Sequence, residues 1–137
     1  MALTRTDEDK NAAITASVAL LNGGELHLFG GTIPTDVTQS LGAATQLTVH
    51  TLSGTAGGAP VAGTITANAI GNGTGLAAAN ATFARFYKAG GTIATRQVPV
   101  VATGAGTGSG YIELDNVSIG IGQTVSITAY TFSSEDT

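Results

Sequence analysis

The two histidines are the side chains in this sequence best suited to acid–base chemistry or metal binding. His27 and His50 each lie in a run of apolar and threonine residues with strand-like alternation. A zinc-binding or catalytic histidine needs a second ligand or an orienting carboxylate, and no H-x-H or H-x-x-x-H spacing is present. We expect both to be strand histidines on a polar or interface face, while pairing with ligands distant in the sequence stays open.

The acidic residues form two groups that could bind a cation. Asp7, Glu8 and Asp9 are consecutive and suit the first turn of a helix, where carboxylates interact favourably with the helix dipole. Glu113 and Asp115 alternate on one predicted strand and so share a face. That pair could serve acid–base chemistry or a calcium site, but no third carboxylate or nucleophile accompanies it. We favour ion pairing with a basic side chain, namely Arg85, Lys88 or Arg96.

The glycine-rich runs lack the spacing of a phosphate-binding loop. A G-x-G-x-x-G pattern begun at Gly104 or Gly71 places Ser109 or Leu76 where the third glycine belongs, and neither run precedes a predicted helix. The G-x-S-x-G motif of serine hydrolases is also missing. We therefore predict no catalytic residue, no cofactor and no metal, and a protein that is not an enzyme.

Composition excludes further classes of protein. The 137 residues include no Cys and only five Lys and Arg, and the net charge is −4. Without cysteine there is no disulfide or thiolate metal site, and so few basic residues argue against binding to nucleic acid or to an anionic membrane surface. No apolar run reaches the length of a membrane span, and we expect no secretory signal in residues 1–10.

Residues 7–22 are predicted to form one helix of about four turns. Thr6 is a suitable N-cap, and apolar residues recur at helical spacing after it. Asn22-Gly23-Gly24 supplies a stop, because glycine accepts the left-handed conformation that closes a helix. We predict an N-terminal arm and helix over residues 1–24 and a β-domain over residues 25–137.

After Gly24 the apolar period changes to two, which is typical of β-strands. Glycine and proline runs separate these segments and predict turns. Short strands without a second helix favour a mainly β fold, an antiparallel β-sandwich that is jelly-roll-like or immunoglobulin-like. The seven strands we predict span residues 25–29, 45–52, 63–70, 81–88, 92–101, 111–115 and 123–132.

Residues 81–101 are predicted to form a hairpin around Ala89-Gly90-Gly91. A two-residue turn places Arg85 opposite Arg96, whereas a three-residue turn places Arg85 opposite Thr95. The first register would need an acidic partner between the two cations. We expect Arg85, Lys88 and Arg96 to form a basic cluster.

Runs of glycine and alanine, such as residues 55–59 and 104–110, would lose conformational entropy as free loops and bury little surface in return. They are either mobile tips or segments that lie flat against a neighbouring chain, where the missing side chains permit close backbone approach. We favour the second interpretation.

Two segments carry a resemblance to a known family. Residues 20–34 read L-L-N-G-G-E-L-H-L-F-G-G-T-I-P, and residues 81–92 read A-T-F-A-R-F-Y-K-A-G-G-T. The first resembles the helix, L-N-G-G, short strand and G-x-x-P opening of small tailed-phage proteins encoded among head genes. The second resembles the aromatic strand with Arg and Lys that leads into a glycine turn in that family. With the Asp115-Asn116 turn and the closing strand at residues 125–128, the likeness covers about residues 10–132.

The resemblance implies a virion structural protein of the capsid cement or decoration type, on the capsid exterior. Its implied partner is the major capsid protein, and it would be a homo-oligomer, either a dimer or a trimer. The alternatives are a tail, baseplate or head-fibre component, or a carbohydrate-binding β-sandwich on the virion surface. For partner contacts we expect the arm and the basic cluster, namely Arg5, Asp7, Glu8, Asp9, Arg85, Lys88 and Arg96.

Overall fold

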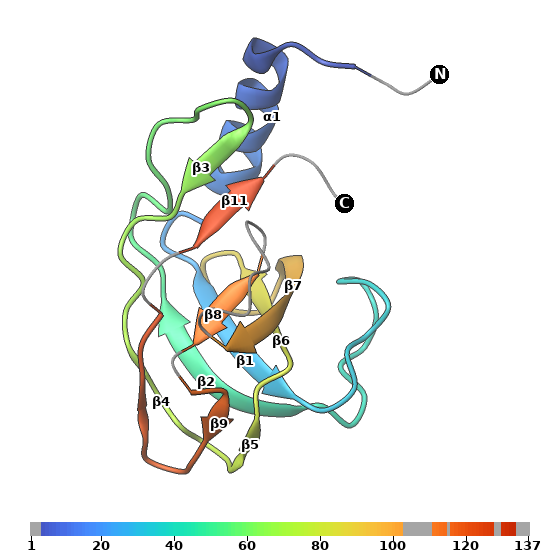
Figure 1. The fold of residues 1–137 in the computed structure, drawn as a ribbon, viewed down its shortest axis with the longest axis vertical. Helices are drawn as coiled ribbons and strands as arrows, with labels where there is room; N and C mark the ends of the chain where they lie inside the picture. The colour runs from blue at the N-terminus through green and yellow to red at the C-terminus, as the bar shows by residue number, and fades with distance from the viewer. Residues whose placement is uncertain (1–3, 103–110, 115, 128–129, 134–137) are drawn as a thin grey trace.

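The computed structural model describes residues 4–102, 111–114, 116–127 and 130–133. One helix, α1 (Asp7–Ala19), precedes eleven strands in this part of the chain, so the prediction of a mainly β fold with an N-terminal helix is confirmed (Figure 1). In the described ranges, no helix is long and apolar enough to cross a membrane. The strands are β1 (Glu25–Gly30), β2 (Thr45–Thr51), β3 (Thr64–Thr66), β4 (Gly73–Thr74), β5 (Ala79–Asn80), β6 (Phe83–Tyr87), β7 (Ala94–Ala102), β8 (Ile112–Leu114), β9 (Ser118–Ile119), β10 (Thr124–Val125) and β11 (Thr131–Ser133).

The helix begins where the sequence predicts. The Thr6 side chain accepts a hydrogen bond from the Asp9 amide, which satisfies one of the free donors of the first turn. Helix α1 ends at Ala19, earlier than predicted, because residues 20–22 tighten into a turn with hydrogen bonds to the carbonyl three residues back. Gly23, with φ of 68°, then turns the chain toward β1.

A five-stranded sheet in the order β2-β1-β6-β7-β8 forms the centre of the molecule. Its first four strands are antiparallel, as predicted, but β8 is parallel to β7, so the antiparallel prediction is wrong for that pair. Three two-stranded ladders accompany the sheet, β10-β4, β11-β3 and β5-β9, and together they give a sandwich-like fold.

Eleven strands replace the seven predicted because several two-residue ladders are too short to leave a sequence pattern. Strands β4, β5 and β9 were not predicted, and the segment predicted at 123–132 contains both β10 and β11, with residues 128–129 outside the described residues. The glycine run at 71–75, predicted as a turn, contains β4. A Cβ on Gly73 would lie 2.9 Å from the His50 ring, so a glycine is what lets this strand approach β2.

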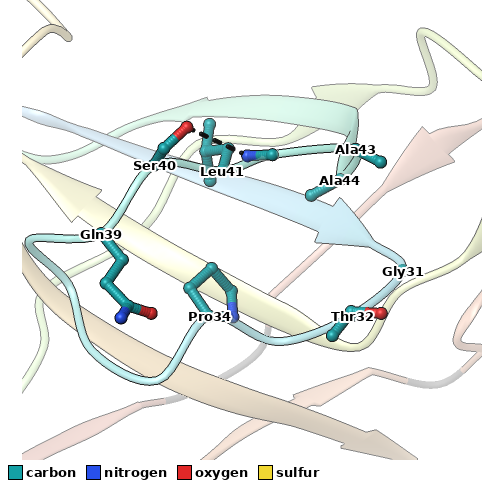
Figure 2. Close-up of a pocket in the computed structure, with 9 residues that line it drawn as sticks. Gly31, Thr32, Pro34, Gln39, Ser40, Leu41, Ala43 and Ala44 are labelled. Atoms are coloured by element: carbon teal, nitrogen blue, oxygen red, sulfur yellow. Dashed lines mark hydrogen bonds between the residues drawn. The ribbon is translucent and has the colours of Figure 1, made fainter.

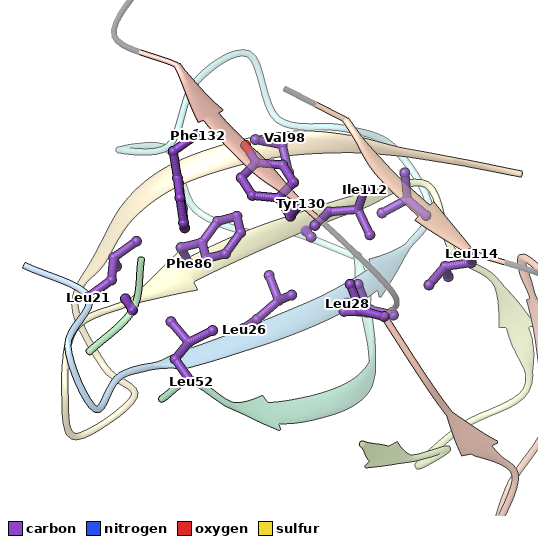
Figure 3. Packing of buried hydrophobic residues seen from close by; sticks show 14 of the residues in the cluster. Leu21, Leu26, Leu28, Leu52, Phe86, Val98, Ile112, Leu114, Tyr130 and Phe132 are labelled. Carbon is purple, nitrogen blue, oxygen red and sulfur yellow. The ribbon is translucent and has the colours of Figure 1, made fainter. Parts of the chain in front are cut away.

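The two faces of the sheet bury separate sets of side chains. Even-numbered positions of β1 and β6, such as Leu26 and Phe86, face the main core, which also contains buried side chains of α1 and β11. Figure 3 shows Leu26 and Phe86 in this core together with Phe132 of β11. Odd-numbered positions face the other way, where Phe29, Phe83 and Tyr87 form a second cluster. We call these sides the core face and the loop face, since residues 31–44 pack on the second.

The register of the β6-β7 hairpin differs from both predicted registers. Arg85 pairs with Gln97 and Phe86 pairs with Arg96, and an irregularity follows between Phe86 and Tyr87. Both Gly90 and Gly91 have positive φ, as the turn requires. Arg85 and Arg96 are therefore not opposite one another, and they lie on different faces of the sheet.

The glycine and alanine run at 55–59 lies against its own chain. Ala56 is buried, and a Cβ on Gly57 would overlap the Ile65 side chain and lie 3.1 Å from Val18. The close backbone approach that we predicted is present within the protein's own chain, against β3 and α1, and contact of the exposed residues of this run with a neighbouring chain stays a prediction. The run at 104–110 lies outside the described residues.

Candidate functional site

Residues 31–44 connect β1 to β2 as a loop that projects from the side of the sheet (Figure 1). At its start, the Thr82 hydroxyl donates to the Gly31 carbonyl at 2.8 Å. Toward its end, Leu41 and Ala44 pack against the aromatic cluster of the loop face. We call this segment the 31–44 loop.

Arg85 fastens the 31–44 loop to the sheet. Only 5% of Arg85 is exposed. Its Nε donates to Gln97 Oε1 at 2.9 Å, and its Nη2 donates to the Gln39 and Asp36 carbonyls at 2.8 and 3.4 Å. Gln97 Nε2 in turn donates to the Pro34 carbonyl at 2.8 Å. A guanidinium presents several donors in one plane, so one side chain can hold the loop backbone at two points.

A second set of bonds shapes the loop tip itself. The Thr38 hydroxyl and amide both donate to the Asp36 carboxylate, and these bonds lower the pKa of Asp36. Gln39 Oε1 accepts from the Thr35 amide at 2.8 Å. These bonds order the loop before a partner binds, so less conformational entropy is lost on binding.

A shallow cavity of about 360 Å³ lies within the 31–44 loop (Figure 2). Its lining is small and uncharged: Gly31, Thr32, Pro34, Gln39, Ser40, Leu41, Gly42, Ala43 and Ala44. The Ser40 hydroxyl accepts from the Gly42 amide at 3.2 Å. No lining residue titrates near neutral pH, so the cavity can accept a small side chain or hydroxyl group but supplies no acid or base for chemistry.

His27 and Glu25 form the only close pair of an imidazole and a carboxylate in the described part of the chain, with His27 Nε2 2.8 Å from Glu25 Oε1. The Tyr87 ring lies 4.2 Å from the imidazole between ring centroids and covers it. Burial raises the pKa of Tyr87, which keeps its hydroxyl protonated. Among the described residues, no three His, Asp or Glu side chains group closely enough to hold a metal ion.

His50 is fully buried on the core side of β2 rather than on the polar or interface face expected from the sequence. Its Nδ1 lies 2.8 Å from the Gly71 carbonyl and its Nε2 lies 2.8 Å from the Thr48 hydroxyl. A neutral ring satisfies both contacts by donating to Gly71 and accepting from Thr48. Burial lowers the pKa of His50, so the ring stays neutral and joins β2 to the segment that leads into β4.

We expect the protein to lose stability as the pH falls below the ordinary histidine value of about 6.5. The lowered pKa of folded His50 means that the unfolded chain binds this proton more readily, so its contribution is complete above that pH and is lost below it. Urea unfolding from pH 8 to 5 measures the effect, which is at most about 1.4 kcal/mol per pH unit for one proton. The variant His50→Gln removes the titrating group. If the free energy of unfolding changed with pH in the same way in the variant and the wild type, the pH dependence would not come from His50.

The acidic first turn of α1 is exposed as predicted. Asp7, Glu8 and Asp9 all face solvent, and Arg5 Nε lies 2.6 Å from Asp9 Oδ2. Arg5 also donates to the Asp9 carbonyl at 3.3 Å. Arg5 is thus paired with Asp9 at the N-terminal end of α1, while Asp7 and Glu8 are exposed.

The basic cluster predicted from the hairpin does not form. Arg85 is buried on the loop face, whereas Arg96 lies on the core face. Arg96 Nη2 donates to Ser17 Oγ at 3.1 Å, Nη1 donates to the Ser133 carbonyl at 3.3 Å, and the guanidinium lies 5.3 Å from the Phe132 ring centroid. Arg96 therefore holds α1 and β11 to the sheet. Lys88, which follows β6, is half-exposed and remains available to a partner.

The other predicted carboxylate pair is described only in part. Glu113 is half-buried on β8, and Asp115 lies outside the described residues. Among the described residues, Arg85 and Arg96 bind carbonyl, amide and hydroxyl acceptors rather than the Glu113 carboxylate.

Sequence reasoning missed Gln97 and the 31–44 loop as parts of one site. The available signal was the spacing of polar Arg85 and Gln97 in two apolar strands, which indicates a shared polar position once the register is known. The irregularity after Phe86 shifts the register of the hairpin, and no local sequence pattern predicts this irregularity.

Comparison with known proteins assigns no family to this site. No family model, curated protein or solved structure matches the chain. Its function has to be inferred from its own residues and their placement.

Proposed function

We propose that this protein is a structural component of a phage virion that binds the outer surface of the assembled capsid and stabilises contacts between major capsid protein subunits. The proposal starts from the resemblance of residues 20–34 and 81–92 to small tailed-phage head proteins. One structural observation supports treating both segments as a functional unit: they form the paired strands β1 and β6, and Arg85 of the second fastens the loop that begins at the end of the first.

The surface of this unit suits binding better than catalysis. The 31–44 loop presents mostly small or polar side chains, the exposed Ile33 and one carboxylate, Asp36, and the cavity lining offers no general acid or base. A pre-ordered loop that fits a subunit surface binds without a large ordering cost. A protein that binds the assembled shell but not free subunits stabilises the shell by mass action, and this effect is repeated at every equivalent site of the lattice.

The proposed contact residues change accordingly. Lys88, Asp7 and Glu8 stay as candidates for partner contacts, and the Arg5–Asp9 ion pair supports the first turn of α1, which carries Asp7 and Glu8. Arg85 becomes a positioning residue, because it acts through the 31–44 loop rather than by touching the capsid. Arg96 holds α1 in place from within the molecule.

The first experiment is quantitative mass spectrometry of purified particles of the phage that encodes this chain. We expect a copy number comparable with that of the major capsid protein, because a shell-stabilising protein must occupy most lattice sites. A few copies per particle would instead favour a tail, baseplate or head-fibre component. Absence from the particle would refute the virion function.

A separate assay checks the carbohydrate-binding alternative. A glycan array probed with the purified protein should show no specific binding, since neither the cavity lining nor the exposed loop offers an aromatic platform. Specific, saturable binding of one glycan class would replace the capsid proposal.

A further inference from the structure

The short strands and turns at one end of the molecule contain no charged residue. Strands β4, β5 and β9 lie at the end of the long axis opposite α1, and β10 pairs with β4 there (Figure 1). Residues 71–80 and 116–127, which build these strands and their turns, contain no Asp, Glu, Lys or Arg. We call this surface the uncharged end.

Two large apolar side chains are exposed on the uncharged end. Leu76 is 56% exposed and Ile121 is 77% exposed. Their turns adjoin, because the Gly75 amide donates to the Gln123 carbonyl at 2.7 Å and the Gly122 amide donates to the Gly75 carbonyl at 2.8 Å. The Leu76 amide also donates to the Leu47 carbonyl at 2.8 Å. The backbone under both side chains is therefore held in place, and the exposed apolar surface is a built feature of the fold.

The distribution of charge indicates what covers this surface. A partner with a charged face would have to bury its charges against a surface whose described residues offer no counter-charge, which is costly. The uncharged end of a second copy of this chain meets the requirement, being equally uncharged and apolar. Two copies joined in this way also keep the acidic turns of their α1 helices, Asp7 to Asp9, at opposite ends of the assembly, where repulsion is weakest.

We propose that the uncharged end is a self-association surface, through which two copies of this protein pair about a two-fold axis with Leu76 and Ile121 at the centre. An isologous contact of this kind uses the same patch on both partners. Exposed apolar side chains at the middle of such a patch lose their contact with water on pairing and supply most of the affinity. This inference does not depend on the proposed capsid function.

Sedimentation velocity over a wide protein concentration range tests the proposal. Wild-type protein should shift from monomer to dimer as concentration rises, and Ile121→Lys and Leu76→Lys should each raise the dissociation constant by about tenfold or more. Val61→Lys is the matched control: Val61 is 70% exposed beside the α1 end, and the substitution makes the same change in net charge. It should dimerise like wild type, and circular dichroism should confirm that all three variants keep the fold.

Three results would overturn the proposal. Wild-type protein that stays monomeric at every concentration would remove self-association. Equal weakening by Val61→Lys would show that the uncharged end has no special role. Capsid binding that is lost in Ile121→Lys while wild type is monomeric would assign the surface to the capsid subunit instead.

Discussion

Replacing Arg85 by alanine is expected to lower the free energy of unfolding by about 2–4 kcal/mol and to release the 31–44 loop. The substitution removes three hydrogen bonds, to Gln97 Oε1 and to the Gln39 and Asp36 carbonyls, and leaves a gap beneath the loop. Among the described residues, Gln97 Oε1 would lose its only hydrogen-bond partner. Urea unfolding measures the stability, and hydrogen exchange over residues 31–44 measures the ordering of the loop.

Two further variants separate this explanation from a general loss of charge. Arg85→Lys keeps the charge but not the planar set of donors, so it should give an intermediate loss. Lys88→Ala removes a half-exposed cation from the same hairpin and should change stability by no more than about 0.5 kcal/mol. If Arg85→Ala were as stable as Lys88→Ala, the buried network would not be what fastens the loop.

Arg85→Lys and Lys88→Glu distinguish a positioning role from a contact role in the proposed capsid binding. If Arg85 acts through the 31–44 loop, Arg85→Lys should lose capsid occupancy in proportion to the increase in hydrogen exchange of that loop. A partner contact would instead respond to Lys88→Glu without any change in loop exchange. Co-sedimentation with capsids that lack the protein gives the occupancy for both.

Replacing Gly24 by alanine is expected to destabilise the protein by about 3 kcal/mol. A Cβ at this position would overlap the Tyr87 carbonyl oxygen and lie 3.0 Å from the Leu21 carbonyl. Neither oxygen can move away easily, because Tyr87 is on β6 and pairs with Glu25 of β1, and the Leu21 carbonyl accepts a hydrogen bond from the Gly24 amide at 2.9 Å. Strand β1 would therefore have to separate from β6 at its first residue, which disturbs the central sheet.

The neighbouring Gly23 supplies a matched control. A Cβ on Gly23 meets no atom within 4 Å, and only its positive φ of 68° opposes a side chain. Gly23→Ala should therefore cost about 1 kcal/mol, the usual penalty for a left-handed alanine. Thermal or urea unfolding measures the stability of both variants. A Gly24→Ala protein no less stable than Gly23→Ala would refute the close approach of β1 and β6.

These two glycines show how far local sequence patterns go. Asn22-Gly23-Gly24 predicts the end of a helix, and Gly23 does turn the chain with positive φ after α1. The need for glycine at position 24 comes instead from Tyr87, which is distant in the sequence and adjacent in the sheet. A pattern over a few residues contains no information about that neighbour.

The candidate site was predicted less well than the fold. Arg85, Lys88 and Arg96 share a hairpin, which predicted a common basic surface. The irregularity after Phe86 instead opposes Arg85 to Gln97, so the two arginines serve different faces. Both then bind neutral acceptors within the chain, which a count of charges along the sequence does not anticipate.

The sequence by itself determined the features that arise within a few residues: the Thr6 cap, the start of α1, the alternation of the longer strands and the glycine turn between β6 and β7. Each depends on local backbone preference and on the period of apolar residues. Only the tertiary structure decided the parallel pairing of β8, the burial of His50 and Arg85, the fastening of the 31–44 loop and the gathering of the uncharged end. These depend on contacts between residues far apart in the chain, whose register and facing are set by packing across the whole sheet.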